Sequence, residues 1–297
     1  MALNLATFKT RALTSLVFVG VMFAGLLWNE WSFLILFSVI HFGCWAEYQR
    51  LVGLIDPGYR NISPFHKYGV MLAGWCLMLY FTSDALTIGS VSLKKIGYWG
   101  GIALIFILPF LEILLSRKIN FKNIGYSAFG LVYISLSLAL FTNLRFIYFD
   151  SNLSIASSKL SLILVLLVIA ALWINDTMAY LVGSFIGRHP LTKISPKKTW
   201  EGTLGGIILS ILVLGAINYF VSSVFDWEAI LQWMTLAAIA SIMGTFGDLL
   251  QSKLKRMANV KDSGQIMPGH GGFLDRFDSL LLAAPFVWIY VVLIMPA

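Results

Sequence analysis

Carboxylates gather in the C-terminal half of the sequence, at the ends of long apolar runs. Asp275 and Asp278 stand three residues apart, so they share one face if that stretch is helical. Asp248 ends a second apolar run, and Asp176 directly follows a third. Ionisable residues at membrane depth are energetically expensive and usually have a partner or a function. Paired hard carboxylates suit Mg²⁺ that is bound together with substrate phosphates.

Two of these carboxylates also have a structural explanation. Asp176 could cap a helix that starts at Thr177. Asp248 could be a helix-end residue whose side chain reaches water. For either residue taken alone, the sequence leaves both interpretations open.

Cations and glycines suited to phosphate binding stand beside two of the carboxylates, between Ser252 and Asp278. Gly271 and Gly272 would let the backbone approach a phosphate closely. His270 sits between glycines, where it has no core to fill. The sequence contains no zinc-ligand or P-loop pattern, so neither site is expected. The cations of this stretch that could contact phosphate oxygens are Lys255, Arg256, Lys261 and Arg276.

A second basic segment, residues 195–202, predicts the start of a helix. Ser195 can cap that helix, and Pro196 suits its first position. Lys197 and Lys198 would then stand at a helix N-terminus, which attracts anions. The alternative is a loop whose lysines only anchor the protein on the cytoplasmic side of a membrane.

The elements that position these residues are predicted to be membrane-spanning helices in an all-α, polytopic bundle. Of the 297 residues, 59% are hydrophobic and 12% are charged, whereas a soluble domain has about 25% charged residues. A helix needs about 20 mostly apolar residues to span a bilayer. Residues 177–187 either continue the sixth candidate span or form a separate half-helix. The nine candidate spans are residues 12–28, 31–46, 68–81, 98–115, 126–141, 160–175, 203–225, 230–250 and 280–296.

The distribution of basic residues predicts the orientation of this bundle. With nine spans, 17 of the 21 lysines and arginines fall on the side of the N-terminus. Cytoplasmic loops are enriched in these residues, so the N-terminus is predicted to be cytoplasmic and the C-terminus to lie outside. The net charge of +7 therefore indicates membrane topology, and nucleic acid is not an expected partner. The same topology brings residues 187–202 and 251–279 to the cytoplasmic face, where Asp248 also lies.

The run from Ser252 to Asp278 resembles the signature of the phosphatidate cytidylyltransferase (CDP-diacylglycerol synthase) family. It reads S-x-L-K-R-x4-K-D-x-G-x2-M-P-G-H-G-G-F-x-D-R-F-D, without a gap. Met267 departs from the family pattern, which has Leu, Ile or Phe there, but the position stays apolar. The resemblance covers residues 160–282, and the first 150 residues match only in hydropathy and length. Shorter similar segments are residues 175–180, 195–202 and 247–249.

Members of this family join CTP and phosphatidic acid, giving CDP-diacylglycerol and pyrophosphate in phospholipid biosynthesis. The resemblance implies a metal site that holds Mg²⁺, with two cations expected, formed by Asp248, Asp275 and Asp278. It implies a cofactor-binding group that consists of Ser195, Gly271 and Gly272. The catalytic group implied by the resemblance consists of Asp176, Lys197, Lys198, Lys255, Arg256, Lys261, His270 and Arg276.

The same resemblance gives expectations for the whole chain. Residues 1–150 are expected to form N-terminal membrane helices, and residues 151–297 a catalytic region whose site faces the cytoplasm from a bacterial inner membrane. The expected partners are CTP, phosphatidic acid, membrane lipid and, as an option, a second copy of the chain in a homodimer. The alternatives are another CTP-dependent enzyme of membrane lipid phosphates, a polyprenol kinase, an ion-coupled transporter or a structural scaffold.

The topology can be tested by labelling single cysteines. The loop around Lys197 is expected to be cytoplasmic, so a Lys197→Cys variant should react with an impermeant thiol reagent only when the inner face is accessible. Labelling of this variant from the outer face alone would contradict the nine-span topology.

Overall fold

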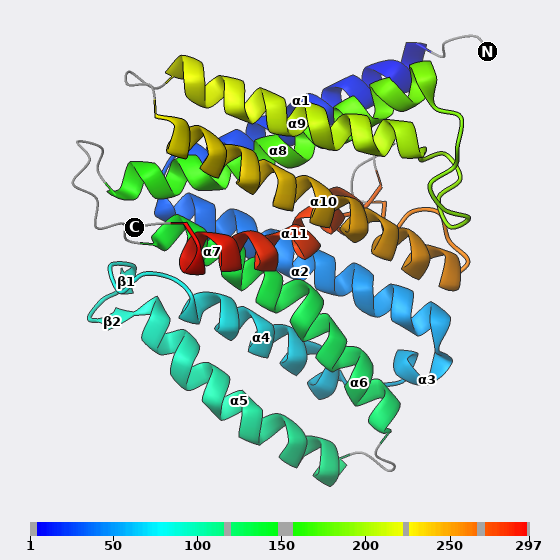
Figure 1. Cartoon of the computed structure of the whole chain (residues 1–297). Coiled ribbons are helices and arrows are strands. Elements are labelled where there is room, and N and C mark those ends of the chain that lie inside the picture. The colour runs from blue at the N-terminus through cyan, green and yellow to red at the C-terminus, as the bar shows by residue number, and fades with distance from the viewer. Residues whose placement is uncertain (1–4, 116–119, 148–156, 222–225, 266–270, 296–297) are drawn as a thin grey trace. The chain divides into compact units, whose positions relative to one another are not determined.

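The computed structural model describes residues 5–115, 120–147, 157–221, 226–265 and 271–295. Over these residues the chain is helical, apart from one short hairpin and the connecting turns (Figure 1). The hairpin pairs β1 (Thr87–Ile88) with β2 (Val91–Ser92), and Thr87 lies opposite Ser92. The helices are α1 (Leu5–Leu27), α2 (Glu30–Ile55), α3 (Pro57–Arg60), α4 (Pro64–Tyr80), α5 (Leu93–Leu115), α6 (Phe121–Gly130), the π-helical η1 (Leu131–Leu136), α7 (Ser137–Phe146), α8 (Ser157–Ile186), α9 (Trp200–Val221), α10 (Trp227–Met257) and α11 (Leu274–Leu293).

The described helices confirm the prediction of a polytopic membrane bundle. Seven helical stretches are long and apolar enough to cross a bilayer, and residues 13–27 of α1 form a shorter apolar helix. The predicted third span corresponds to α4, which has 17 residues. The chain is therefore an integral membrane protein, and the number of nine spans stays a prediction.

The helix α8 settles two alternatives that the sequence leaves open. It runs from Ser157 to Ile186 without a break, so the segment after Asn175 continues the sixth span and does not form a separate half-helix. Asp176 lies inside this helix and does not cap a helix at Thr177. The helix cap is thus excluded as the explanation for Asp176.

Residues 1–142 and 254–277 form one compact unit, whose core is built along α2. Helix α2 packs against α1, α3 and α4. Its Phe37 ring lies 4.6 Å from the ring centroid of Phe33 and 5.1 Å from that of Phe141. About two turns further along α2, the Trp45 indole donates a 2.8 Å hydrogen bond to the hydroxyl of Ser135 in η1. Helix α2 is therefore buried through its centre, and a charged group on that face needs hydrogen-bond donors.

Residues 143–253 and 278–297 form a second compact unit, in which α8 packs along α9 (Figure 1). Small residues make this close packing. A Cβ atom at Gly202 would lie 2.6 Å from the carbonyl oxygen of Ala179, and one at Gly206 would lie 2.6 Å from that of Asn175. Side chains on those two positions would push the helices apart, so the glycines set their spacing. The predicted division at residue 150 is a functional assignment and stays a prediction.

Candidate active site

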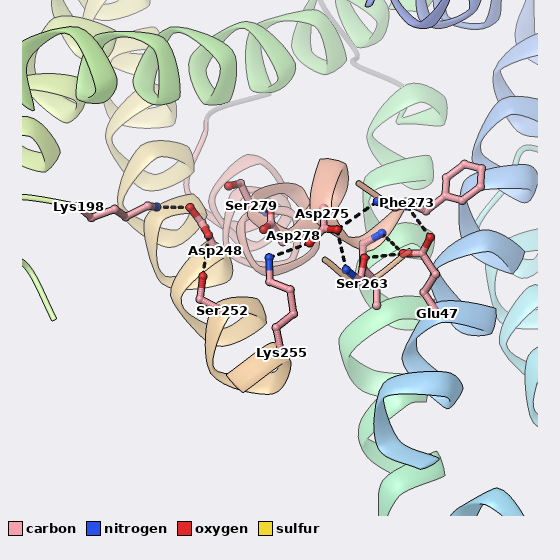
Figure 2. A network of polar contacts seen from close by, with 12 residues as sticks. Glu47, Lys198, Asp248, Ser252, Lys255, Ser263, Phe273, Asp275, Asp278 and Ser279 are labelled. Atoms are coloured by element: carbon pink, nitrogen blue, oxygen red, sulfur yellow. Dashed lines mark hydrogen bonds and ion pairs between the residues drawn. The ribbon is translucent and has the colours of Figure 1, made fainter. Parts of the chain in front are cut away.

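The carboxylate of Asp275, in the first turn of α11, is surrounded by donors from its own compact unit (Figure 2). Its Oδ1 accepts a 2.7 Å hydrogen bond from the Lys255 ammonium. Its Oδ2 accepts from the backbone N–H groups of Ser263, at 2.7 Å, and Gly272, at 3.1 Å. The side chains of Asp275 and Lys255 are 9% and 15% exposed. The Asp275 carboxylate therefore joins the start of α11 to the end of α10, through Lys255, and to the loop residues Ser263 and Gly272.

Two left-handed backbone positions allow the chain to reach this point. Helix α10 ends at Met257, and Asn259 follows with a φ of 54°, while the N–H of Val260 bonds back to the carbonyl of Lys255 at 2.9 Å. This arrangement is a common way to end a helix and turn the chain. Gly271 has a φ of +86°, and a Cβ atom there would lie 2.6 Å from Oδ2 of Asp275. Glycine is thus required at Gly271 for two reasons, its backbone conformation and the space beside the carboxylate.

A second buried carboxylate, that of Glu47 on α2, meets the same segment (Figure 2). Its Oε2 accepts hydrogen bonds from the Ser263 hydroxyl, at 2.6 Å, and from the Leu274 N–H, at 2.9 Å. Its Oε1 accepts from the Phe273 N–H at 2.9 Å. The sequence interpretation missed this residue because it ended the second span at Ala46. Helix α2 runs to Ile55, so Glu47 is an acid inside an apolar helix, and the rule that singled out Asp176 and Asp248 would have found it.

In the other compact unit, Asp248 of α10 forms an ion pair with Lys198 (Figure 2). The two side chains are each 28% exposed. The Ser252 hydroxyl, one turn further along α10, donates to Oδ1 of Asp248 at 3.2 Å. A predicted metal ligand and a predicted phosphate ligand are thus paired with each other.

The backbone of Asp278 contacts α10 at Gly247, the residue next to Asp248. A Cβ atom at Gly247 would overlap the backbone carbonyl of Asp278, so the two backbones touch there. The Asp278 side chain is buried, and its Oδ1 accepts a 2.7 Å hydrogen bond from the N–H of Ser279. Two of the three predicted metal carboxylates therefore come from adjoining points of α10 and α11.

The prediction that a helix starts at Ser195 and Pro196 is wrong, because α9 begins at Trp200. Residues 189–200 form a short hairpin-like loop instead, in which the Leu191 N–H bonds to the Lys198 carbonyl at 2.7 Å and the Trp200 N–H to the His189 carbonyl at 2.9 Å. These backbone bonds use groups that a helix from Ser195 would need for itself. The Thr199 hydroxyl, and not that of Ser195, accepts from a first-turn N–H of α9, that of Gly202, at 3.1 Å.

A carboxylate in the first turn of α9 closes this loop. Glu201 accepts hydrogen bonds from the backbone N–H groups of Arg188, at 3.1 Å, and His189, at 3.3 Å, and lies 2.6 Å from Nδ1 of His189. Glu201 thus joins the start of α9 to the chain that follows α8, and no helix N-terminus lies beside Lys197. Lys197 is exposed and forms no ion pair with any described residue.

The remaining charged residues of the prediction that the structure describes are exposed. Arg256 and Lys261 are exposed and have no ion pair within the part of the chain that the structure describes. Arg276 is exposed in the first turn of α11, and Asp176 is exposed on α8. His270 lies outside the described residues. The structure thus groups Lys255 with Asp275, groups Lys198 with Asp248, and leaves the other cations at the surface.

The predicted metal ligands fit a cation unequally. Among the described residues, no three His, Cys, Asp or Glu side chains converge closely enough to hold a metal ion. Asp248 is partly exposed and pairs with the Lys198 ammonium. The backbone carbonyl of Asp278 lies beside Gly247, the residue before Asp248. Their hard oxygens suit Mg²⁺. Both oxygens of Asp275 already accept hydrogen bonds, so a cation there would have to displace Lys255.

The sequence of this chain is similar to those of known proteins. The model of the cytidylyltransferase family matches residues 9–294. The chain is similar to proteins named phosphatidate cytidylyltransferase. One from Synechocystis sp. is 44% identical over 135 residues, which cover 46% of this chain and 45% of that protein. One from Staphylococcus aureus is 37% identical over 193 residues, which cover 64% and 68% of the two chains.

A relative from Staphylococcus saprophyticus, also named phosphatidate cytidylyltransferase, is similar along almost its whole length. It is 30% identical over 289 residues, which cover 96% of this chain and 99% of that protein. The match covers most of the first 150 residues, which the sequence alone related to the family only by hydropathy. The family predicted from the signature segment is thus confirmed, and the chain belongs to the cytidylyltransferase family.

Proposed function

We propose that this protein transfers the cytidylyl group of CTP to phosphatidic acid, which gives CDP-diacylglycerol and pyrophosphate. The observation that carries the proposal is the similarity to a phosphatidate cytidylyltransferase over 96% of the chain. The ion pairs Lys255–Asp275 and Lys198–Asp248 support it, because all four residues lie in segments that resemble the family. An ion-coupled transporter is less well supported, since these carboxylates are held by loop N–H groups and lysines.

The reaction needs positioned charge more than it needs a base. An anionic phosphate oxygen of phosphatidic acid attacks the α-phosphorus of CTP, a new P–O bond forms, and the bond to the β-phosphate oxygen breaks. Pyrophosphate leaves with the electron pair of that bond. The nucleophile is already ionised near neutral pH, so no general base is required. Charge neutralisation and in-line alignment of the phosphates are the main contributions a protein can make.

The residues of this chain divide into two proposed groups. Asp248 and Asp278 would hold Mg²⁺, and Asp275 would join them if Lys255 gave up its contact. The metal would neutralise charge on the CTP phosphates when it is bound. The residues proposed to contact phosphate oxygens or to position the substrates are Asp176, Ser195, Lys197, Lys198, Lys255, Arg256, Lys261, His270, Gly271, Gly272 and Arg276.

The site is proposed to face the cytoplasm from a bacterial inner membrane. The distribution of lysines and arginines supports this side, and CTP is a cytoplasmic metabolite. A lipid substrate can then keep its phosphate at the membrane face while its acyl chains stay among lipids. A homodimer is the assembly proposed for the protein in the membrane.

Substrate choice tests the proposed function. Purified protein should convert radiolabelled CTP into a labelled lipid in vesicles that contain phosphatidic acid. Vesicles that contain only a polyprenyl phosphate, or only phosphatidylglycerol, should give no labelled lipid. A labelled product from polyprenyl phosphate and none from phosphatidic acid would assign the chain to another lipid phosphate.

Neutralising a metal-site carboxylate tests the proposed cation site. Asp275→Asn and Asp278→Asn should each nearly abolish turnover, by at least about a hundredfold, because charge neutralisation in the transition state is lost. Both variants should still insert into the membrane. Asp262→Asn is the matched control, since Asp262 is an exposed acid in the same segment. Near-normal activity of both variants at saturating Mg²⁺ would rule out the metal role.

Replacing the two loop lysines tests whether they serve substrates or only topology. Lys197→Met and Lys198→Met should each lower kcat/KM by about ten- to a hundredfold, because a charge-assisted hydrogen bond of roughly 1.5–3 kcal/mol is lost. A lysine that acts only through the total charge of its loop should tolerate the change. Lys193→Met is the control, because Lys193 is exposed in the same loop and forms no ion pair with any described residue. If all three variants behave alike in steady-state kinetics, the loop is only an anchor.

A further inference from the structure

We infer that Glu47 is a positioning residue, a carboxylate from α2 that holds the signature segment and the start of α11 in place. The inference rests on the proposed function only for its effect on catalysis, since the contacts themselves are structural. Glu47 lies more than 200 residues before its partners in the sequence, in the half of the chain to which no site residue had been assigned. It gives the N-terminal helices a part in the reaction.

The contacts of Glu47 are those of an anchor, not of an ion pair. The residue is 6% exposed, and all three of its hydrogen bonds come from neutral donors. No lysine, arginine or histidine among the described residues pairs with it. Two of the donors, the N–H groups of Phe273 and Leu274, lie at the N-terminal end of α11. The first N–H groups of a helix lack partners within it and carry partial positive charge, so a carboxylate there satisfies both needs.

Two glycines of the signature segment leave the space that this carboxylate occupies. A Cβ atom at Gly264 or at Gly272 would overlap the carboxylate oxygens of Glu47. Neither position has a left-handed φ, so backbone conformation does not explain these glycines. The two glycines are instead explained by the space that the Glu47 carboxylate occupies. Gly272 was predicted to approach a substrate phosphate, and the structure gives it a second role that needs no substrate.

An apolar contact on the same helix supports the anchor. Gly43 lies one turn before Glu47 on α2, and a Cβ atom there would overlap the ring of Phe273. The backbone of Phe273 therefore bonds to one turn of α2 while its ring packs on the preceding turn. This combination fixes both the position and the direction of the chain as it enters α11.

Ser263 connects this anchor to Asp275. Its hydroxyl donates to Glu47, and its backbone N–H donates to Asp275. Removing the Glu47 carboxylate would therefore free the start of α11 and loosen one of the three donors that orient Asp275. The expected consequence is faster local opening at Ser263 and at the start of α11, and a lower kcat in the proposed transfer, in a protein that still folds around the rest of α2.

The first test replaces the carboxylate by an amide of the same shape. In Glu47→Gln, one oxygen becomes an NH₂ group, so whichever way the amide is placed, the N–H of Phe273 or of Leu274 has no acceptor. Hydrogen exchange of peptides that cover residues 262–277, measured by mass spectrometry without substrates, should become about ten- to a hundredfold faster. Ser263→Ala, which removes one donor only, should give a smaller increase and serves if Glu47→Gln does not fold.

The control is Glu112→Gln, another carboxylate of the same compact unit. Glu112 lies 3.1 Å from His66 and its side chain is 18% exposed. It forms no ion pair with the described residues of the signature segment. Exchange of residues 262–277 should stay at the level of the unchanged protein in this variant. Unchanged exchange in both Glu47→Gln and Ser263→Ala, or an equal increase in Glu112→Gln, would overturn the inference.

A double-mutant cycle separates the anchor from a direct substrate role of Gly272. Gly272→Ala should speed exchange and lower kcat when Glu47 is present, because the new methyl group displaces the carboxylate. The same substitution should have little further effect in a Glu47→Ala background, where the space is free. Additive effects on kcat would mean that Gly272 acts on the substrate and not through Glu47. Because exchange is read without substrates, it decides the role of Glu47 even if the protein makes no CDP-diacylglycerol.

Discussion

The start of α11 is held by two buried carboxylates, and the candidate site depends on how they are satisfied. Glu47 accepts the N–H groups of Phe273 and Leu274, while Asp275 accepts the Lys255 ammonium and two backbone N–H groups. An ionised group buried away from water is strongly unfavourable unless such donors surround it. The loop between α10 and α11 must therefore adopt a backbone that points its N–H groups at these two side chains. Gly264, Gly271 and Gly272 follow from that requirement.

The same principle explains why charged residues can occur in so apolar a chain. Lys198 with Asp248 and Lys255 with Asp275 are pairs of opposite charge, each between a lysine proposed for phosphate and a carboxylate proposed for a cation. Paired in this way, the groups are neutralised in the absence of substrates. If CTP and a metal bound as proposed, each member of a pair would gain a partner of opposite charge, so the contacts could be exchanged without leaving a charge unpaired. Such exchange suits an enzyme whose reaction depends on positioned charge.

The sequence predicts the apolar helices and the family, because these depend on local composition and a contiguous motif. It places Asp275 and Asp278 on one face only if their stretch is helical, and α11, which begins at Leu274, supplies that helix. The sequence could have marked Glu47 as an acid in an apolar helix, but it does not predict the partners of Glu47, which lie more than 200 residues away and depend on tertiary packing. The helix start at Ser195 was predicted from residues that cap helices well, but the same residues are common in turns. Backbone hydrogen bonds across the loop and the contacts of Glu201 stabilise the turn instead of a helix. Local preferences give way where such long-range contacts compete with them.

The fate of the CTP phosphates tests the central claim, cytidylyl transfer to a lipid phosphate, most directly. Purified protein in vesicles of phosphatidic acid would receive CTP labelled at the α-phosphorus in one sample and at the γ-phosphorus in another, with Mg²⁺ or with a chelator. If the protein transfers the cytidylyl group, the α label enters the lipid, the γ label is released in pyrophosphate in equal amount, and the chelator stops both. Entry of the γ label into the lipid would show a kinase and contradict the account.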